Sequence, residues 1–235
     1  MASSGAIKAE PEHLILALDT STPACTAALF AADGSLFARA DQVIGRGHAE
    51  FLAPMIADML GGHEQVRLPP TVLALSGGQR DRLIPASILV GIGPGSFTGL
   101  RIGIACAHGL AVGWDIPIHG MSSLALIACG APGDGPIAVA VSGGHGEIFV
   151  AEFARPGLKP VGAVANLTPA IAAGLIDARL VVGSGAAALV AARGSGEAID
   201  LLPAAANALS LPTALRSLPP SPLYARAPDA RPVAA

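Results

Sequence analysis

A glycine-rich segment from Gly91 to Gly103 restricts most strongly how this chain can fold. Its letters, GIGPGSFTGLRIG, run from a predicted strand through a turn into a predicted helix. Small residues then recur at every fourth position and leave one helix face almost bare: Gly99, Gly103, Ala107 and Ala111. A glycine inside a helix costs about 1 kcal/mol relative to alanine, so such a face implies that another backbone packs closely against it. The spacing leaves open whether that backbone belongs to the same chain or to another subunit.

The turn before this helix lacks the signatures of nucleotide-binding loops. No Gly-Lys-Ser/Thr follows, and Thr98 stands where a dinucleotide-binding loop has its third glycine. Ser96 or Thr98 can instead cap the helix through its hydroxyl. Elsewhere, Leu52 follows His48 where a His-Glu-x-x-His zinc motif has its second histidine, and the chain has no Gly-x-Ser-x-Gly nucleophile elbow. Because all of these motifs are absent, the sequence gives no motif evidence for a hydrolase or for a nucleotide-dependent enzyme.

The hydrophobic pattern predicts an α/β protein. Apolar runs predict strands at residues 14–18, 26–30, 36–43, 72–75, 87–92, 137–141, 147–153 and 180–182. Helical spacing predicts helices at 48–60, 98–112, 122–129, within 183–193 and in part of 204–218, and residues 115–118 should be extended. The first three strands should form an antiparallel meander, because Asp33-Gly34 is a hairpin signal.

A repeated pattern suggests how these elements are organised. A strand, a polar turn and a second strand occur at 14–29 and again at 137–153, which predicts a duplicated architecture of two lobes. We therefore divide the chain into a flexible tail (1–12), an N-terminal α/β lobe (13–120), a second, smaller α/β lobe (121–218) and a Pro-rich tail (219–235).

The composition narrows the classes of protein that fit. Hydrophobic residues make up 52% and charged residues 13%, a balance that excludes bulk disorder. The net charge of −3 argues against a chain that holds nucleic acid alone. A long uncharged stretch, 116–133, is broken by prolines and glycines and does not resemble a membrane span. Three widely spaced cysteines (Cys25, Cys106, Cys129) and no visible export signal favour reduced thiols in a cytoplasmic protein.

Two polar turns are the candidate sites for a nucleotide or phosphate. The first turn follows the first strand and contains Asp19, Thr20, Ser21 and Thr22. The second follows the first strand of the second lobe and contains Ser142, Gly143, Gly144 and His145. Hydroxyl groups and glycine backbone at strand ends can hold phosphate oxygens. The alternative for each is an ordinary polar hairpin turn.

Four strings of residues together resemble one protein family. They are Leu14-Ile-Leu-Ala-Leu-Asp-Thr-Ser-Thr-Pro-Ala-Cys-Thr-Ala-Ala-Leu29, then Gly91-Ile-Gly-Pro-Gly-Ser-Phe-Thr-Gly-Leu-Arg-Ile-Gly-Ile104, then Gly109-Leu-Ala through Ile116-Pro117 to Gly120, and the late Pro222-Leu-Tyr-Ala-Arg226. They resemble the bacterial TsaB family, closely over most of residues 14–123 and loosely beyond. The resemblance implies the two-lobed α/β fold of actin, Hsp70 and sugar kinases, with RNase H-like lobes built on mixed sheets.

The same resemblance implies a function and a set of partners. It implies a cytoplasmic, non-catalytic scaffold or activator in the formation of N6-threonylcarbamoyladenosine on tRNAs that read codons beginning with adenine. The partners would be a TsaD-like transferase, as a heterodimer, and a TsaE-like ATPase, with a homodimer in isolation. The chain would contact tRNA only through the complex. No tightly bound cofactor is expected, although ATP or ADP could bind at the complex interface.

The resemblance also selects an interface and excludes a metal site. It places the partner on the glycine-rich helix, with these contact residues: Gly95, Phe97, Gly99, Leu100, Gly103, Ile104, Ala107 and Ala111. On that basis Gly103→Leu and Ala107→Glu should block association and leave the monomer folded. The two metal-binding histidines of TsaD fall on Ser123 and Ile127, which are not useful ligands. The chain should therefore neither bind that metal nor transfer the group alone, even though Ser142-Gly-Gly-His145 resembles the corresponding TsaD loop.

Two enzymatic hypotheses remain as alternatives. A small ATP-binding, kinase-like enzyme would use both polar turns. A metalloprotease, a description often given to this superfamily, is less well supported because the ligand pair is absent from the sequence.

Overall fold

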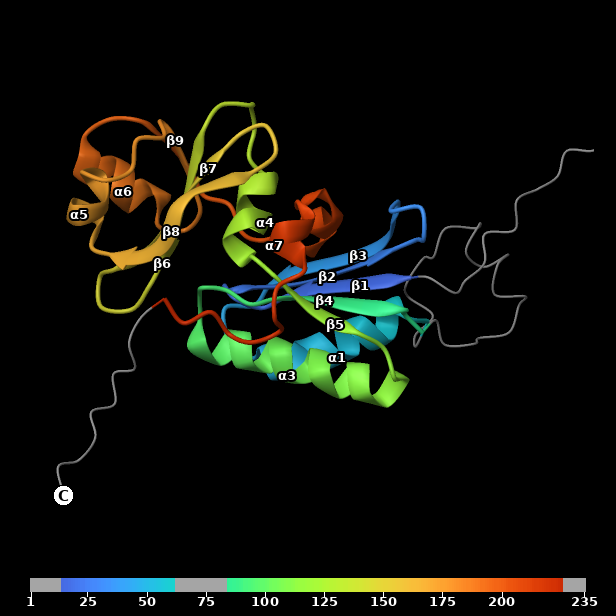
Figure 1. The fold of residues 1–235 in the computed structure, drawn as a ribbon. Coiled ribbons are helices and arrows are strands. Elements are labelled where there is room, and N and C mark those ends of the chain that lie inside the picture. Colours follow the sequence, from blue (N-terminus) through green and yellow to red (C-terminus); the bar gives the residue numbers. More distant parts are fainter. Residues whose placement is uncertain (1–13, 62–83, 226–235) are drawn as a thin grey trace, which may run out of the picture.

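Two five-stranded sheets form the framework of the protein (Figure 1). The computed structural model describes residues 14–61 and 84–225. The first sheet has the order β3-β2-β1-β4-β5 and contains β1 (Ile15–Asp19), β2 (Ala24–Phe30), β3 (Leu36–Val43), β4 (Ser87–Gly91) and β5 (Ile118–Met121). The second has the order β10-β9-β6-β7-β8 and contains β6 (Ile137–Ser142), β7 (Ile148–Ala154), β8 (Lys159–Leu167), β9 (Leu180–Val182) and β10 (Glu197–Ile199).

The two sheets share one topology. In each, the first three strands are antiparallel neighbours, and the fourth strand pairs in parallel with the first. The fifth strand then pairs in parallel with the fourth. This is the RNase H-like order, so both the predicted duplication and the predicted fold class are confirmed.

Helices cover both faces of the first sheet. The helices α1 (His48–Met59) and α3 (Phe97–Trp114) pack on one face, below the sheet in Figure 1. The helix α4 (Ser123–Cys129) and the 3-10 helix η2 (Ala205–Ser210) pack on the other, between the two sheets. Strand β1 needs helices on both faces because its side chains are apolar on both. Leu16 and Leu18 point to the α1/α3 core, and the small Ala17 points to the α4 core.

The remaining helices complete the second lobe and the return of the chain. The helices α5 (Pro169–Ala173) and α6 (Ala186–Arg193) pack on the outer face of the second sheet. After β10 the chain returns to the first lobe through η2 and α7 (Thr213–Arg216), and the backbone of Leu218 pairs with Gly120 beside β5. Residues 205–225 therefore lie on the first lobe. From the sequence, 205–218 are assigned to the second lobe, whereas in the structure these residues pack against the first sheet.

Several predicted elements need correction. Residues 219–225 are not a detached tail, because they pack along α3 and β5. Asp115 is not extended but ends α3 in a left-handed conformation with φ 54°. Strands β8 and β10 and helix α5 were not predicted, and the predicted strand at 72–75 lies outside the described residues. In the described part of the chain, no helix combines the length and apolar character needed to cross a bilayer. The three cysteines are free thiols, with Cys25 buried.

Candidate functional site

The loop before α3 is held between three segments of the chain. The Ser96 N–H donates to the Ser21 carbonyl at 2.7 Å, and the Ile92 carbonyl accepts from the Leu223 N–H at 2.8 Å. The Ser96 hydroxyl accepts from the Gly99 N–H at 3.2 Å, so the predicted helix cap is confirmed. The start of α3 is therefore fixed by the first polar turn on one side and by the C-terminal segment on the other.

The small-residue face of α3 is covered by the chain itself. Thr20 lies against it, and its hydroxyl donates to the Gly99 carbonyl at 2.8 Å. A Cβ on Gly99 would collide with the Thr20 carbonyl, and one on Gly103 with the Thr20 hydroxyl. Ala107 and Ala111 are buried in the same core. The close backbone approach implied by the glycines is thus made within the same chain. This is one of the two alternatives that the spacing left open.

The interface predicted on this face must therefore be revised. Leu100 and Ile104 are also buried in the first lobe, and a Cβ on Gly95 would collide with the Ser21 carbonyl. Of the eight residues assigned to the interface, Phe97 alone is well exposed, at 54%. Phe97 is the one member of the set with a side chain that a partner could reach without rearrangement.

The opposite face of α3 points to solvent and was missed by the sequence reasoning. It carries Arg101, Ala105, His108, Gly109, Val112 and Gly113. Val112 is 82% exposed, and a Cβ on Gly109 or Gly113 would meet no atom of the described residues within 4 Å. A second four-residue spacing of small residues (Ala105, Gly109, Gly113) was present in the sequence and could have indicated this face.

The C-terminal segment forms a strap along this exposed face. We call residues 218–225 the strap; in Figure 1 it descends from α7 past β5 to the start of α3. His108 Nε2 donates to the Pro220 carbonyl at 3.1 Å, and Arg101 Nε donates to the Tyr224 hydroxyl at 3.2 Å. The strap therefore adds Leu223 and Tyr224, both exposed, to the surface of α3.

The first polar turn is closed from within. Asp19 is 0% exposed, and its Oδ1 accepts from the Ser21 N–H at 2.8 Å and from the Ser21 hydroxyl at 2.7 Å. Its Oδ2 accepts from the Ser123 hydroxyl at 2.6 Å, and that hydroxyl in turn accepts from the Gly93 N–H at 3.0 Å. Ser123 is the first residue of α4, so the carboxyl group joins β1 to the helix between the lobes.

The rest of this turn is equally enclosed. Thr20, Ser21 and Thr22 are all buried. The Thr22 hydroxyl accepts from the Ala24 N–H at 3.2 Å, and the Thr22 carbonyl accepts from His48 Nε2 at 2.9 Å. These side chains satisfy one another, and the turn presents no open cradle to phosphate oxygens in this conformation. The alternative of an ordinary polar turn describes it better than the predicted phosphate contact.

The pH dependence of stability should report on Asp19. Burial raises the pKa of Asp19 above its ordinary value, although hydrogen bonds from Ser123 and Ser21 oppose the shift. At pH values between the pKa of Asp19 in the unfolded chain and its higher pKa in the folded chain, the folded chain binds one more proton than the unfolded chain. The stabilisation that comes from this proton is therefore complete below about pH 4. It falls by about 1.4 kcal/mol per pH unit as the pH rises, until the pKa of the folded state is passed. Urea titrations across about pH 4 to 8 should show the stability of the wild type falling relative to that of Asp19→Asn. A difference independent of pH would contradict the assignment.

The second polar turn is open, unlike the first. Ser142, Gly144 and His145 are exposed, and Gly143 is half-buried. Ser142 is paired with Ser184 in the turn after β9: its N–H donates to the Ser184 hydroxyl at 3.1 Å, and its hydroxyl donates to the Ser184 carbonyl at 3.1 Å. The structure thus separates the predicted nucleotide contacts into a buried half in the first lobe and an exposed half in the second.

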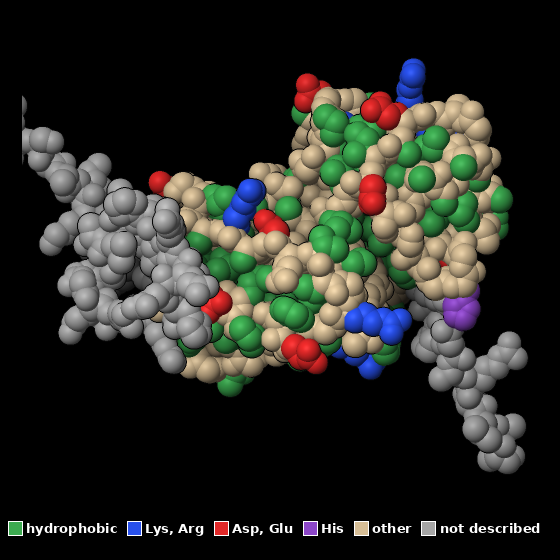
Figure 2. Space-filling view, turned by 180° about the vertical axis from the view of Figure 1, so that it is seen from behind, with side chains coloured by type: hydrophobic (Ala, Val, Ile, Leu, Met, Phe, Trp, Pro, Cys, Tyr) green, Lys and Arg blue, Asp and Glu red, His purple; other side chains and the backbone are tan. Residues whose placement is uncertain are grey.

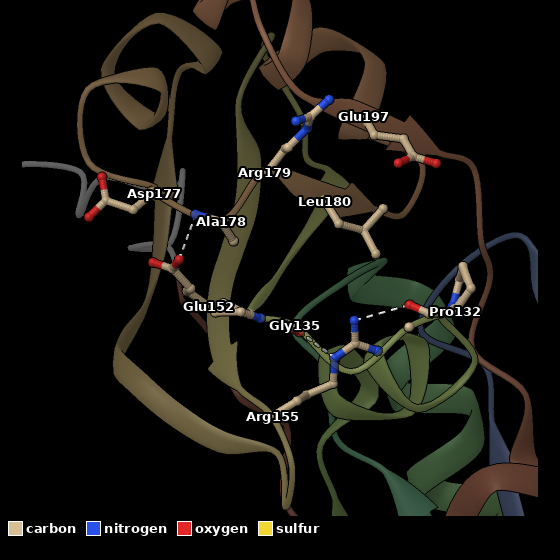
Figure 3. Close-up of a pocket in the computed structure, with 11 residues that line it drawn as sticks. Pro132, Gly135, Glu152, Arg155, Asp177, Ala178, Arg179, Leu180 and Glu197 are labelled. Atoms are coloured by element: carbon tan, nitrogen blue, oxygen red, sulfur yellow. Dashed lines mark hydrogen bonds between the residues drawn. The ribbon is translucent and has the colours of Figure 1, made fainter.

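A groove of about 630 Å³ lies elsewhere, at the start of β9 and β10 (Figure 3). One of its two arginines, Arg155, is engaged by the backbone, because its guanidinium donates to the carbonyls of Ala131, Pro132 and Gly135. Glu152 accepts from the Ala178 N–H at 2.7 Å. The inner charges of the groove therefore stabilise the chain itself, and its other charged residues lie exposed on the rim.

Comparisons with known proteins find relatives in tRNA threonylcarbamoyladenosine biosynthesis. Residues 85–175 match the family model "TsaD: tRNA N6-adenosine threonylcarbamoyltransferase". The chain is 36% identical over 144 residues to the Escherichia coli tRNA threonylcarbamoyladenosine biosynthesis protein TsaB, a match that covers 60% of this chain and 55% of that protein. It is 32% identical over 229 residues to the uncharacterized protein Rv3421c of Mycobacterium tuberculosis, covering 94% of this chain and 95% of that one.

A solved structure extends the similarity to the fold. YeaZ from Pseudomonas aeruginosa superposes with a TM-score of 0.70 at 29% identity, over 90% of this chain and 99% of that chain. The matched part of this chain spans little more than half of the E. coli protein, whereas the M. tuberculosis protein and YeaZ are matched over nearly their whole length. The sequence strings, the duplicated fold and these relatives together show that the chain belongs to the TsaB (YeaZ) family.

Proposed function

We propose that this chain is a non-catalytic subunit that binds and activates a TsaD-like transferase. The product of the complex would be N6-threonylcarbamoyladenosine on tRNAs that read codons beginning with adenine. The E. coli relative is described as a tRNA threonylcarbamoyladenosine biosynthesis protein, and the matching family model describes a tRNA threonylcarbamoyltransferase. We place the chain in the cytoplasm, with a TsaE-like ATPase as a further component.

The closed Asp19 turn carries this proposal. At the two positions where the resemblance puts the metal-binding histidines of TsaD, this chain has Ser123 and Ile127. Ser123 uses its hydroxyl to donate to Asp19, and Ile127 is buried among apolar residues. The potential donor set is therefore one carboxyl group already engaged by three donors, which does not fit a catalytic metal. This supports an auxiliary role and gives no specific support to the kinase-like or protease alternatives.

The solvent-facing side of α3 supports a docking role. Gly109 and Gly113 each cost about 1 kcal/mol relative to alanine inside a helix, and neither has a neighbour among residues 14–61 and 84–225 that would explain the cost. Close approach of a partner backbone would explain both. The exposed Phe97, Val112 and Tyr224 add apolar area to the same surface. We therefore assign the transferase, and the homodimer in its absence, to this face.

Contact with tRNA is assigned to the complex as a whole. With Lys+Arg 14 against Asp+Glu 17, the chain has no excess of positive charge to neutralise phosphates. Figure 2 shows Lys and Arg scattered among Asp and Glu on one face of the molecule, without a continuous basic surface. A nucleotide at the complex interface would use the open Ser142–His145 turn, since the Asp19 turn is enclosed.

Light scattering coupled to size-exclusion chromatography tests the docking role. The chain mixed with the TsaD-like protein of the same organism should give a one-to-one species that replaces any homodimer. Val112→Glu should weaken this association at least about 30-fold, because it places an unpaired charge in the interface. Val43→Glu, on the exposed end of β3, is the matched control and should bind as wild type. Unchanged levels of the modified nucleoside after gene deletion would refute the function itself.

A further inference from the structure

An arginine and two aromatic rings form an exposed cluster where α3 meets the strap. The Arg101 guanidinium lies over the Phe97 ring, with its central carbon 3.8 Å from the ring centroid. Arg101 Nε donates to the Tyr224 hydroxyl at 3.2 Å. The rings of Phe97 and Tyr224 are 5.6 Å apart at an interplanar angle of 34°. The three side chains contact one another in a single unit.

The fold brings this cluster together from distant parts of the sequence. Tyr224 and Arg101 are separated by 123 positions. The strap is fixed by a two-way backbone pairing of Leu218 with Gly120, by the Leu223 N–H on the Ile92 carbonyl, and by His108 on the Pro220 carbonyl. Because the strap is anchored along its length, Tyr224 holds the arginine in one orientation. The side-chain entropy of Arg101 is thus largely lost before any partner arrives.

Among the residues that the structure describes, no carboxylate pairs with the charge of Arg101. Helix α3 contains no Asp or Glu, and Arg101 forms no ion pair within residues 14–61 and 84–225. Its Nε is used by Tyr224, while its Nη atoms make no hydrogen bond to the described residues. A guanidinium carries five N–H donors, so four remain for an external acceptor. Their planar pair matches the two oxygens of a carboxylate.

We propose that Arg101, held by Phe97 and Tyr224, is an anchor that binds a carboxylate side chain of the protein partner on the exposed face of α3. The proposal rests on the docking role argued above and specifies the chemistry of the partner at this point. Arg and Tyr are the residue types that most often dominate interface energies. The partner is expected to present an Asp or Glu within an otherwise apolar patch.

The surroundings favour a protein carboxylate over an RNA phosphate. Phosphate-backbone binding needs several cations along a track. Beside Arg101 this face of α3 offers His108, exposed glycines and the apolar side chains of Val112 and Leu223. A single charge inside an apolar surface is typical of a protein interface anchor.

The test measures the dissociation constant of the complex of the full chain with the TsaD-like protein of the same organism. Arg101→Met should weaken binding at least about 30-fold and reduce the salt dependence of binding. Tyr224→Phe keeps the ring but removes the acceptor for Nε, and should weaken binding about 3- to 10-fold. Arg39→Met, an exposed arginine on β3 whose loss also removes a positive charge, is the matched control and should bind as wild type. Because Arg101 is exposed, thermal midpoints should stay close to wild type in all variants.

The outcomes separate this inference from the proposed function. If the wild-type complex forms and Arg101→Met binds equally well, the anchor is refuted and the docking role stands. If Arg101→Met loses self-association or tRNA binding by the assembled complex, but not transferase binding, the ligand assignment is wrong. If the wild-type proteins do not associate at all, the docking role fails and the anchor fails with it. If one Asp→Lys or Glu→Lys substitution on the partner restores the binding that Arg101→Glu loses, the substituted residue is the carboxylate that Arg101 binds.

Discussion

Ala107→Glu and Gly103→Leu are expected to destabilise the isolated chain strongly, Ala107→Glu the more so. Ala107 has 0% exposure in the core formed by α3, α1 and the first sheet, so a glutamate there would bury a charge without a partner. That cost is several kcal/mol, which is comparable with the roughly 5–15 kcal/mol that stabilises an ordinary domain. A leucine at Gly103 would collide with Thr20 and displace the turn that Asp19 holds, at a cost of about 1–3 kcal/mol or more. Urea unfolding followed by circular dichroism measures both effects.

Gly109→Leu is the matched control for Gly103→Leu. Both positions lie in α3, but a Cβ at Gly109 meets no atom within 4 Å in the part of the chain that the structure describes. Gly109→Leu should keep or slightly raise the urea midpoint, because it removes a helix glycine, and should still lose transferase binding. If Gly103→Leu had a wild-type midpoint and failed to bind, the inward orientation of this face would be wrong. From the sequence alone we expect the opposite of what the structure implies, namely a Gly103→Leu monomer that stays folded and fails to bind the transferase.

The two faces of α3 show where sequence reasoning reaches its limit. The inward set (Gly99, Gly103, Ala107, Ala111) and the outward set (Ala105, Gly109, Gly113) have the same four-residue spacing. A helix with small residues on both sides gives no internal sign of which side meets the sheet. The answer comes from Thr20, which approaches Gly99 from 79 positions away. The existence of a close contact was therefore predictable, and its partner was not.

The Asp19 turn illustrates a second limit. From the sequence, hydroxyl groups beside an aspartate at a strand end fit both a phosphate site and an ordinary polar turn. The deciding residue is Ser123, 104 positions away, which fills the position opposite the carboxyl group. The strands with clear apolar runs, such as β1, β2 and β4, were predicted to within about two residues at their ends, whereas β8, which is longer but mostly exposed, was not. Short elements such as α5, five residues, and β10, three residues, leave too little periodic signal to detect.

Asp19→Ala is expected to lower the free energy of unfolding by about 3 kcal/mol or more. The substitution leaves the Ser21 N–H and the hydroxyls of Ser21 and Ser123 without their common acceptor. Each buried donor left unpaired costs about 1–3 kcal/mol. The hydroxyls can rotate toward other acceptors, but the Ser21 N–H is fixed in the backbone and cannot. Urea unfolding at neutral pH measures the loss.

Asp19→Asn and Ser123→Ala locate the source of that loss. The asparagine keeps one carbonyl oxygen for both Ser21 donors, so Asp19→Asn should retain most of the stability that Asp19→Ala loses. Ser123→Ala removes the link to α4 and also leaves the Gly93 N–H without its acceptor, so it should fall between the two. Since α4 lies between the two sheets, Ser123→Ala should also speed amide exchange in Leu124–Cys129 more than in β1. Wild-type stability in Asp19→Ala would show that the turn holds itself without the carboxyl group, and an open anion site at Asp19 would then regain support.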